Sequence, residues 1–552
     1  MSDNNNDYMK PDGDVNPIDT DYTIGQDNIV MNVGPFGLDI HNRVFGVSAL
    51  LIIIFVVLTM AFQEQAEPMF SSLRGWLTSS LDWFFITAGN IFVVVCLAIA
   101  VSPLGRVRIG GTEATPDYSY AGWFSMLFAA GMGIGLMFYG VSEPLSHFNS
   151  SLAGTSMENG VRTDWAPLGA AGGDNAAATK LAMAATIYHW ALHPWAIYAV
   201  LALGLAIFSF NKGLPLTIRS VFYPLLGERI WGWPGHLIDI LAVLATMFGL
   251  ATSLGFGSSQ AAAGLHFLFG VPLGDGVQIL LVIGITAIAM ISVLAGLEAG
   301  VKRLSEINMI LAGILVLFVI FVGPTLVIVS GFFDNLLSYI EYLPALGNPI
   351  GREDANFSQG WTAFYWAWWI SWSPFVGMFI ARVSRGRSVR EFIVSVLIVP
   401  SLACIMWMTV FGETAIFQVV NDGYKAVTDA DLPLQIFYML EALPLHAITS
   451  FVAIILVVVF FVTSSDSGSL VIDVIASGGK VESPAPQRVF WCTFEGLVAI
   501  ALILGGGAVA LQAMAVSTGF PFAIVLLVAT VSLIKGLMSE PRITKKARRQ
   551  TT

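Results

Sequence analysis

Tryptophan is concentrated in one apolar stretch, residues 364–382, which reads FYWAWWISWSPFVGMFIAR. Tyr365, Trp369 and Trp372 are spaced i, i+4 and i+7, so they would share one face of a helix. Aromatic faces bind organic cations, and a quaternary ammonium suits such a site because it has no N–H to donate. Tryptophan also collects at membrane interfaces. The stretch therefore indicates either a cage for an organic cation or an interfacial aromatic belt.

A second aromatic cluster reads YHWALHPWAIY. Trp190, Trp195 and Tyr198 project within about 140° of one another on a helical wheel and could complete the same cage. His189 and His193 are spaced i, i+4, which is also a spacing of metal ligands. The motif has no acidic partner, so we interpret the two histidines as core or hydrogen-bonding residues.

Glycine recurs in the apolar stretch AGWFSMLFAAGMGIGLMFYG. Gly131, Gly133 and Gly135 alternate in its middle and predict an unwound helix, which is tolerated at membrane depth only where it lines a cavity or is buried in protein. Close helix packing through small residues is the alternative. The tryptophan-rich stretch carries Pro374 and Gly377 and is expected to be interrupted too. Paired interruptions at corresponding positions predict a transporter site near the bilayer midplane.

Hydroxyl groups cluster in the segment TSSDS. Thr463, Ser464 and Ser465 lie within one helical turn of Asp466. Hydroxyl and carbonyl oxygens are hard ligands that suit Na⁺. The alternative is that the same hydroxyls donate back to their own helix or across to a neighbouring helix.

The composition indicates a membrane protein. Of the 552 residues, 56% are hydrophobic and only 11% are charged, whereas soluble domains have roughly 25% charged residues. The net charge of −11 gives no support to a nucleic-acid partner. We predict an all-α polytopic fold with twelve transmembrane helices. These spans are expected at residues 43–62, 81–102, 121–141, 180–210, 235–266, 276–296, 306–331, 359–381, 391–413, 446–474, 488–504 and 511–534.

The distribution of apolar runs and charged residues divides the chain into five predicted regions. They are a disordered acidic tail (1–42), two peripheral N-terminal membrane helices (43–120), a first repeat (121–331), a second repeat (332–534) and a short basic tail (535–552). Most of the 26 Lys and Arg residues fall in loops that this count assigns to the inside. Because basic residues collect in cytoplasmic loops, both termini are expected in the cytoplasm.

Four segments, in this order, resemble the betaine/carnitine/choline transporter family: GMGIGLMFYG, HWALHPWAIY, FYWAWWISWSPFVGMFIARVSRGRS and TSSDS. The resemblance covers the third to twelfth spans. It implies two N-terminal helices followed by a 5+5 inverted-repeat, LeuT-like core, assembled as a homotrimer in the lipid bilayer of a bacterial inner membrane. In related choline carriers the position of Gly135 tends to be aspartate, so glycine here favours zwitterionic betaines over choline.

The resemblance also implies which residues bind the substrate. The central cage around a trimethylammonium group would be formed by Trp190, Trp195, Tyr198 and Trp369. The path next to the cage would be lined by Trp366, Trp368 and Trp372. Backbone groups for the substrate, including its carboxylate end, would come from Gly131, Met132, Gly133, Ile134 and Gly135.

Sodium sites are implied in the same way. One Na⁺ would be held by the carbonyls of Ala129, Met132 and Phe460 and the hydroxyls of Thr463 and Ser464. A second Na⁺ site of the family is matched only at Thr246 and Phe375, because Leu250 and Glu495 stand where the family has threonines. A glutamate within a span is costly unless it is neutral, paired or wetted. Glu495 and Asp466 are therefore candidates for ion coupling, and the number of coupled ions stays open.

We expect a secondary active importer and not an enzyme. Na⁺ would drive alternating access for a betaine-type zwitterion, either glycine betaine or its sulfonium analogue dimethylsulfoniopropionate, with osmoprotection as the role. Two alternatives stay open. One is a proton-coupled choline or carnitine carrier of the same fold. The other is a channel, although the sequence shows no ring of charge and no repeated filter loop.

Overall fold

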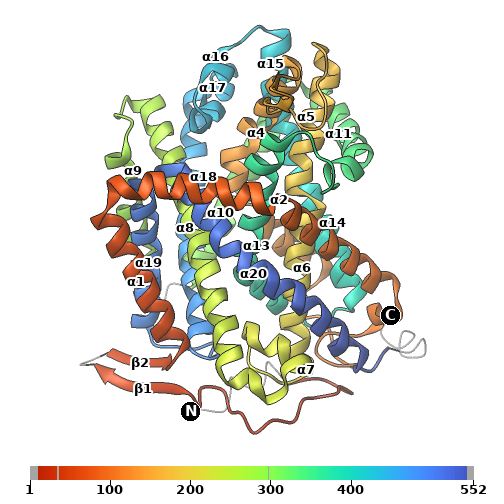
Figure 1. Ribbon diagram of the computed structural model, residues 1–552, viewed down its shortest axis with the longest axis vertical. Helices are drawn as coiled ribbons and strands as arrows, with labels where there is room; N and C mark the ends of the chain where they lie inside the picture. The colour runs from red at the N-terminus through yellow and green to blue at the C-terminus, as the bar shows by residue number, and fades with distance from the viewer. Residues whose placement is uncertain (1–9, 34–35, 296–297, 544–552) are drawn as a thin grey trace.

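The computed structural model describes residues 10–33, 36–295 and 298–543, and their regular structure is helical apart from two short antiparallel hairpins (Figure 1). The hairpins pair β1 (Asn28–Val33) with β2 (Phe36–His41), and β3 (Met157–Glu158) with β4 (Val161–Arg162). Eleven helices of the described residues are long and apolar enough to cross a membrane, or twelve if one bent pair forms a single span. The predicted all-α polytopic membrane fold is confirmed.

The helices differ widely in length. The longer ones are α1 (Val44–Ala61), α2 (Gln63–Val101), α3 (Tyr120–Gly131), α4 (Ile134–Ala153), α5 (Asn175–Trp190), α6 (Leu192–Ala206), α8 (Trp233–Phe269), α9 (Asp275–Ala295), α10 (Glu298–Val322), α11 (Thr325–Leu346), α13 (Ala363–Val383), α14 (Val389–Met408), α18 (His446–Ala476), α19 (Ala485–Leu504) and α20 (Gly507–Met538). Short α-helices are α7 (Tyr223–Leu226), α12 (Ala355–Phe357), α15 (Thr414–Asn421), α16 (Ala426–Asp429) and α17 (Gln435–Glu441). The 3₁₀ and π turns are η1 (Pro103–Arg106), η2 (Ile207–Asn211), η3 (Ile218–Phe222), η4 (Gly227–Trp231), η5 (Ser358–Thr362), η6 (Thr409–Glu413) and η7 (Leu432–Leu434).

The third predicted span is broken, as expected. α3 ends at Gly131, α4 begins at Ile134, and the two helices are bent by 64°. Between them Met132 and Gly133 have extended backbone, and Gly133 has φ −171° and ψ −174°. The run of alternating glycines therefore coincides with the break.

The tryptophan-rich span is continuous, so the predicted interruption there is wrong. α13 runs through Pro374 and Gly377 without a break. Pro374 cannot donate to the carbonyl of Ile370, but the Ser373 hydroxyl donates to that oxygen at 2.7 Å and replaces the lost hydrogen bond. Gly377 lies at the contact between α13 and α6, where a Cβ would be 3.4 Å from the backbone nitrogen of Ala202, an ordinary van der Waals distance.

The fourth span carries a break that the sequence analysis does not predict. α5 ends at Trp190 and α6 begins at Leu192, and Ala191 between them has φ −101° and ψ −115°. Pro194 follows in the first turn of α6, where its missing N–H costs little. The structure thus has its two helix breaks in the third and fourth spans, which are neighbours in sequence, and not in the third and eighth spans.

The helix assignments also differ from prediction around α11 and α13. α13 is long enough to cross a membrane but less apolar than the eleven helices, because tryptophan and serine take the place of aliphatic residues. Nearly all of its side chains are buried, so it needs no lipid-compatible surface. α11 is apolar enough to span but is not among the predicted spans, and the predicted repeat boundary after residue 331 falls inside it.

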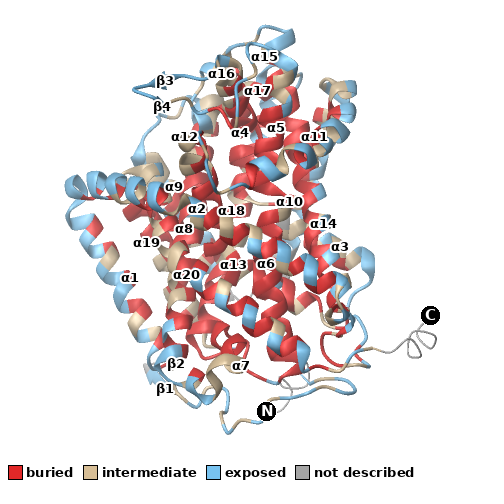
Figure 2. Ribbon diagram, turned by 45° about the vertical axis from the view of Figure 1, so that its right-hand side comes forward, coloured by how far each residue is buried: buried red, intermediate tan, exposed pale blue. Residues whose placement is uncertain are grey.

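Burial separates an interior from a periphery (Figure 2). α4, α5, α6, α8 and α13 are the interior helices, with α13 packed along α6 and α18 along α8. The first part of α2 runs across the bundle rather than along it (Figure 1). α1, α9, α10 and α11 keep many large apolar side chains exposed, as contact with lipid tails requires. The interior helices are the ones that carry the predicted cage.

The expectation of a disordered tail over residues 1–42 does not hold for the part that the structure describes. The β1–β2 hairpin forms there, and Asp39 pairs with Lys480 from the segment after α18. Asp12 pairs with Arg385 at 2.6 Å. Acidic groups of the tail are thus matched by basic groups of loops that we predict to lie inside. This tertiary pairing is the physical reason for the difference, since composition alone does not reveal it.

The two ends of the described chain lie together. The Asn16 side chain donates to the Ser539 carbonyl at 3.3 Å, and its backbone N–H donates to Glu540 at 3.4 Å. Lys212 pairs with the same glutamate at 2.5 Å. If both termini are cytoplasmic, they must lie on the same side of the membrane, and these contacts place the two ends of the described chain together. Of the predicted basic tail, residues 544–552 lie outside the described residues.

Candidate functional site

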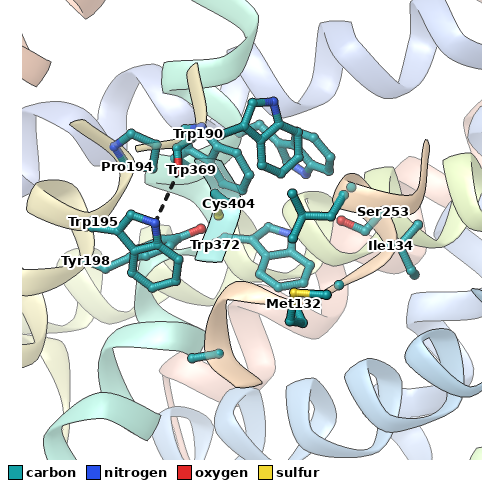
Figure 3. A pocket seen from close by; sticks show the side chains of 15 residues that line it. Met132, Ile134, Trp190, Pro194, Trp195, Tyr198, Ser253, Trp369, Trp372 and Cys404 are labelled. Atoms are coloured by element: carbon teal, nitrogen blue, oxygen red, sulfur yellow. Dashed lines mark hydrogen bonds between the residues drawn. The ribbon is translucent and has the colours of Figure 1, made fainter. Parts of the chain in front are cut away.

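A cavity lies beside the α3–α4 break, between α5, α6, α8, α13 and α14 (Figure 3). Five indoles and one phenol form most of its walls, and its lining includes no charged side chain. Ten of the predicted binding residues line it: Met132, Gly133, Ile134, Gly135, Trp190, Trp195, Tyr198, Trp368, Trp369 and Trp372. Gly131, the end of α3, directly precedes them in the chain.

The α5–α6 break holds two of these indoles in place. Carbonyls in the last turn of α5 lack partners within the helix, and Pro194 cannot donate to the carbonyl of Trp190. Trp195 Nε1 donates to that carbonyl at 3.3 Å, as Figure 3 shows by a dashed line. Trp369 Nε1 donates to the carbonyl of His189 at 2.9 Å. The break therefore orients both indoles while it satisfies the backbone.

α13 presents a second group of indoles toward α8. Trp372 Nε1 donates to the Gly249 carbonyl at 2.9 Å, and Trp368 Nε1 approaches the same oxygen at 3.4 Å. Trp368 and Trp369 stack with ring centroids 5.2 Å apart and planes at 13°. Positions i, i+1 and i+4 fall within about 100° on a helix, so these residues form one aromatic wall.

Rings from α5, α6 and α13 meet nearly at right angles. Trp190 and Trp369 have centroids 4.9 Å apart and planes at 78°. Trp195 and Tyr198 are 5.4 Å apart at 77°, and Tyr198 meets Trp369 at 84°. A cation among such rings can contact more than one aromatic face, each contact contributing about 0.5–2 kcal/mol. The structure thus brings together the four residues of the predicted central cage.

The helix break supplies the polar end of the cavity. α4 begins at Ile134, and the first N–H groups of a helix have no partner within it and carry its positive dipole end. Such a helix end suits a carboxylate. Gly135 is needed for close approach, since a Cβ there would lie 2.8 Å from Trp190 Cη2 and 3.1 Å from Trp368 Cη2. The cavity therefore pairs anion-binding backbone with cation-binding rings, which matches a small zwitterion.

Trp366 does not line the cavity, although the family resemblance implies that it does. It is fully buried, stacks on His193 with centroids 5.3 Å apart and planes at 9°, and meets Tyr188 edge-on at 5.0 Å. On the α13 wheel Trp366 lies about 60° from Trp369, on the side away from Trp368. It packs α13 against α5 and α6.

The two histidines of the fourth span are hydrogen-bonded core residues, as interpreted from the sequence. His193 Nε2 lies 2.9 Å from Asn90 Oδ1 in α2. His189 Nδ1 lies 2.6 Å from Glu143 Oε1 in α4. Glu143, His147 and His189 have their ligand atoms within 4.8 Å of one another, and both histidines are hydrogen-bonded to Glu143 Oε1.

Six residues at or behind the cavity are not among the predicted site residues: Ala130, Leu136, Pro194, Ser253, Cys404 and Glu143. Ser253 from α8 and Cys404 from α14 line it, but neither belongs to a local motif that could have signalled this position. Glu143 lies behind Trp190 and is fully buried. A carboxylate within a membrane span is costly, which is why Glu495 is a candidate functional residue. The same reasoning identifies Glu143 as a candidate.

The hydroxyl cluster of α18 shows the back-bonding that the sequence analysis left open. Thr463 Oγ1 donates to the carbonyls of Val459 at 3.0 Å and Phe460 at 3.3 Å. A hydroxyl that donates in this way keeps its lone pairs for a cation. Thr463 and Ser464 are half-buried, and their helix α18 packs against α4.

The donor set for a second Na⁺ is incomplete. Thr246 Oγ1 donates to the Ala242 carbonyl at 2.7 Å. Leu250 is an apolar packing residue, since a Cβ on Gly468 of α18 would lie 2.3 Å from its side chain. Phe375 packs edge-on against an indole of the cavity wall at 5.4 Å. Of Thr246, Leu250 and Phe375, only Thr246 therefore offers a side-chain oxygen.

The two coupling candidates lie in different surroundings. Glu495 is fully buried in α19, where it accepts a hydrogen bond from Ser465 Oγ at 2.9 Å. Its Oε1 has no hydrogen-bond partner among the described residues. Asp466 instead lies 3.7 Å from Arg488.

Comparison with known proteins decides the family. The sequence profile of the betaine/carnitine/choline family transporters matches residues 43–542. The chain belongs to this family. A glycine betaine/proline/choline transporter of Vibrio parahaemolyticus is 72% identical over 546 residues, which cover 99% of both chains. A glycine betaine transporter of the same organism is 52% identical, covering 94% of this chain and 97% of the relative. Membership makes the protein a multi-pass membrane transporter and not an enzyme.

Proposed function

We propose that the protein is a secondary active symporter that imports a betaine-type zwitterion together with Na⁺. The observation that carries this proposal is the cavity, in which rings that meet nearly at right angles lie beside the N-terminal turn of α4. A methylated onium head suits the rings, and a carboxylate suits the helix end. The names of the relatives support glycine betaine as the first substrate, and dimethylsulfoniopropionate has the same two groups. Accumulation of such solutes would serve osmoprotection.

Sodium would act at the same break as the substrate. The carbonyls of Ala129 and Met132 belong to the break, and the hydroxyls of Thr463 and Ser464 belong to α18, which packs against α4. A cation held between them would stabilise the form of the broken helix that binds substrate. Differential binding of this kind is what couples the two solutes thermodynamically.

The proposed location is the inner membrane of a bacterium, with both termini in the cytoplasm. Bacterial relatives support the first point. The contacts between the N-terminal segment and the end of α20, together with the basic loops at that end, support the second. We further propose a homotrimer, as the family resemblance implies.

Proton coupling is the second candidate function. The observation that favours it is Glu495, a buried carboxylate with one oxygen lacking a partner among the described residues. A carboxyl group within a membrane helix is a typical element of a proton relay. Asp466 is a weaker candidate because it lies near Arg488.

Uptake by the purified protein in liposomes tests both candidates. Radiolabelled glycine betaine is supplied under an inward Na⁺ gradient alone, a proton gradient alone, or neither. Accumulation above equilibrium with Na⁺ alone supports the proposed function, whereas accumulation with protons alone supports the second candidate. Equilibration without accumulation in every condition indicates a channel. Competition by dimethylsulfoniopropionate, choline, carnitine, ectoine and proline then ranks the substrates.

A further inference from the structure

We propose that Glu143 supplies the negative charge of the aromatic cage and thereby sets its preference for a full onium cation. Glu143 lies in α4, about two and a half turns after the break, and its side chain is fully buried. The inference rests on the proposed function and adds to it a residue that determines specificity from behind the cavity wall.

Four side chains converge on this carboxylate. Trp190 Nε1 donates to Oε2 at 2.7 Å, and the Tyr365 hydroxyl donates to the same oxygen at 2.5 Å. His189 Nδ1 and His147 Nε2 lie 2.6 and 3.3 Å from Oε1. Both oxygens therefore receive two partners, and the partners come from α4, α5 and α13.

The identity of the partners indicates an ionised carboxylate. An indole N–H can only donate, and an ionised carboxylate accepts from all four partners when His189 Nδ1 and His147 Nε2 carry hydrogen. Neutral imidazoles complete the cluster, because the Thr362 hydroxyl, 2.9 Å from His189 Nε2, can donate to that nitrogen. His147 Nδ1 has no partner among the described residues, which a neutral ring tolerates better than a charged one. The cluster as a whole then carries one negative charge.

This charge lies directly behind the cage. The indole of Trp190 donates to Glu143 on one side and lines the cavity on the other, where it meets Trp369 at 4.9 Å. A hydrogen bond to a carboxylate polarises the donor group and places more electron density on the ring that faces the cation. The cavity lining itself carries no charge, so Glu143 supplies a counter-charge that the lining lacks.

The position of Glu143 predicts unequal effects on two kinds of substrate. A zwitterion also carries a carboxylate, which Glu143 repels, and it has the α4 N-terminus as a second anchor. Choline carries the onium charge alone and depends more on the charge behind the rings. Loss of that charge should therefore weaken choline binding more than betaine binding.

Uptake kinetics of Glu143→Gln test the inference. Glutamine keeps an acceptor for Trp190 and Tyr365 but removes the charge. We expect the KM for glycine betaine to rise severalfold, and the inhibition constant of choline against betaine uptake to rise at least threefold more. Tyr365→Phe is the matched control, because it removes one hydrogen bond and leaves the charge. It should change both constants by the same factor.

Three outcomes would overturn the inference: equal changes for betaine and choline in Glu143→Gln, no change in either, or failure of choline to inhibit the wild-type protein. If Glu143→Gln does not reach the membrane, Glu143→Asp tests the inference instead. Aspartate keeps the charge, so the ratio of the choline inhibition constant to the betaine KM should stay at its wild-type value. A changed ratio there contradicts the inference. Failure of the proposed function is distinct, since it would appear as no betaine uptake by the wild-type protein.

Discussion

Gly135 of α4 and Trp190 of α5 are so close that a Cβ on the glycine would lie 2.8 Å from the indole Cη2. Trp190 cannot easily withdraw, because its Nε1 is hydrogen-bonded to Glu143 at 2.7 Å. The break of the third span and the break of the fourth span are thus fitted to each other at one contact. The indole of Trp190 can lie against the start of α4 because Gly135 has no side chain.

Gly135→Ala should therefore impair substrate binding. Overpacking of a tight contact costs roughly 1–3 kcal/mol, so the KM for glycine betaine should rise about tenfold or more if Trp190 is displaced. Gly135→Asp adds the same Cβ and also a carboxylate next to the cage. Relative to Gly135→Ala, it should shift the preference from betaine toward choline. The measurement is uptake of both labelled solutes by each variant, and equal ratios in the two variants would count against a charge effect at this position.

Trp369→Ala should weaken binding of the onium head. The variant removes a ring that meets both Trp190 and Tyr198 nearly at right angles. Loss of one such face costs about 0.5–2 kcal/mol, which corresponds to a KM roughly two- to thirtyfold higher. Trp366→Phe on the same helix is the control, because Trp366 packs against His193 outside the cavity. A KM for betaine that is unchanged in Trp369→Ala would contradict the cage.

Removal of the α18 hydroxyls should weaken the dependence of transport on Na⁺. In the double variant Thr463→Ala, Ser464→Ala, we expect the Na⁺ concentration for half-maximal uptake to rise about tenfold, because two of the proposed oxygen ligands are lost. Thr449→Ala on the same helix removes a hydroxyl with the same back-bonding pattern near the start of α18 and should leave the Na⁺ titration unchanged. Identical titration curves for the double variant and the wild-type protein would argue for proton coupling.

Cys404 offers a natural reporter of occupancy, because all three cysteines are buried but only Cys404 lines the cavity. A methanethiosulfonate that carries a trimethylammonium group should enter the cage, form a mixed disulfide with Cys404 and block uptake. Glycine betaine should slow this inactivation, and Cys404→Ala should resist it. Equal inactivation of Cys404→Ala and the wild-type protein would show that the reagent acts elsewhere.

The amino-acid sequence by itself determined the class of the protein and most of the cavity wall. Apolar runs of about 20 residues can only be satisfied as membrane helices, and aromatic residues at helical spacing must share a face. The glycines at 131, 133 and 135 marked a helix break correctly, because a backbone without side chains gains little from staying helical there.

Only the tertiary structure decided which proline interrupts its helix and which rings face the cavity. Pro374 is accommodated because Ser373 takes over its hydrogen bond, whereas Pro194 follows a true break whose free carbonyls hold Trp195 and Trp369. The burial of Glu143 against two aromatic donors likewise depends on contacts between α4, α5 and α13. These features depend on hydrogen bonds between residues that are not neighbours in sequence. Residue spacing along a single helix does not predict such bonds.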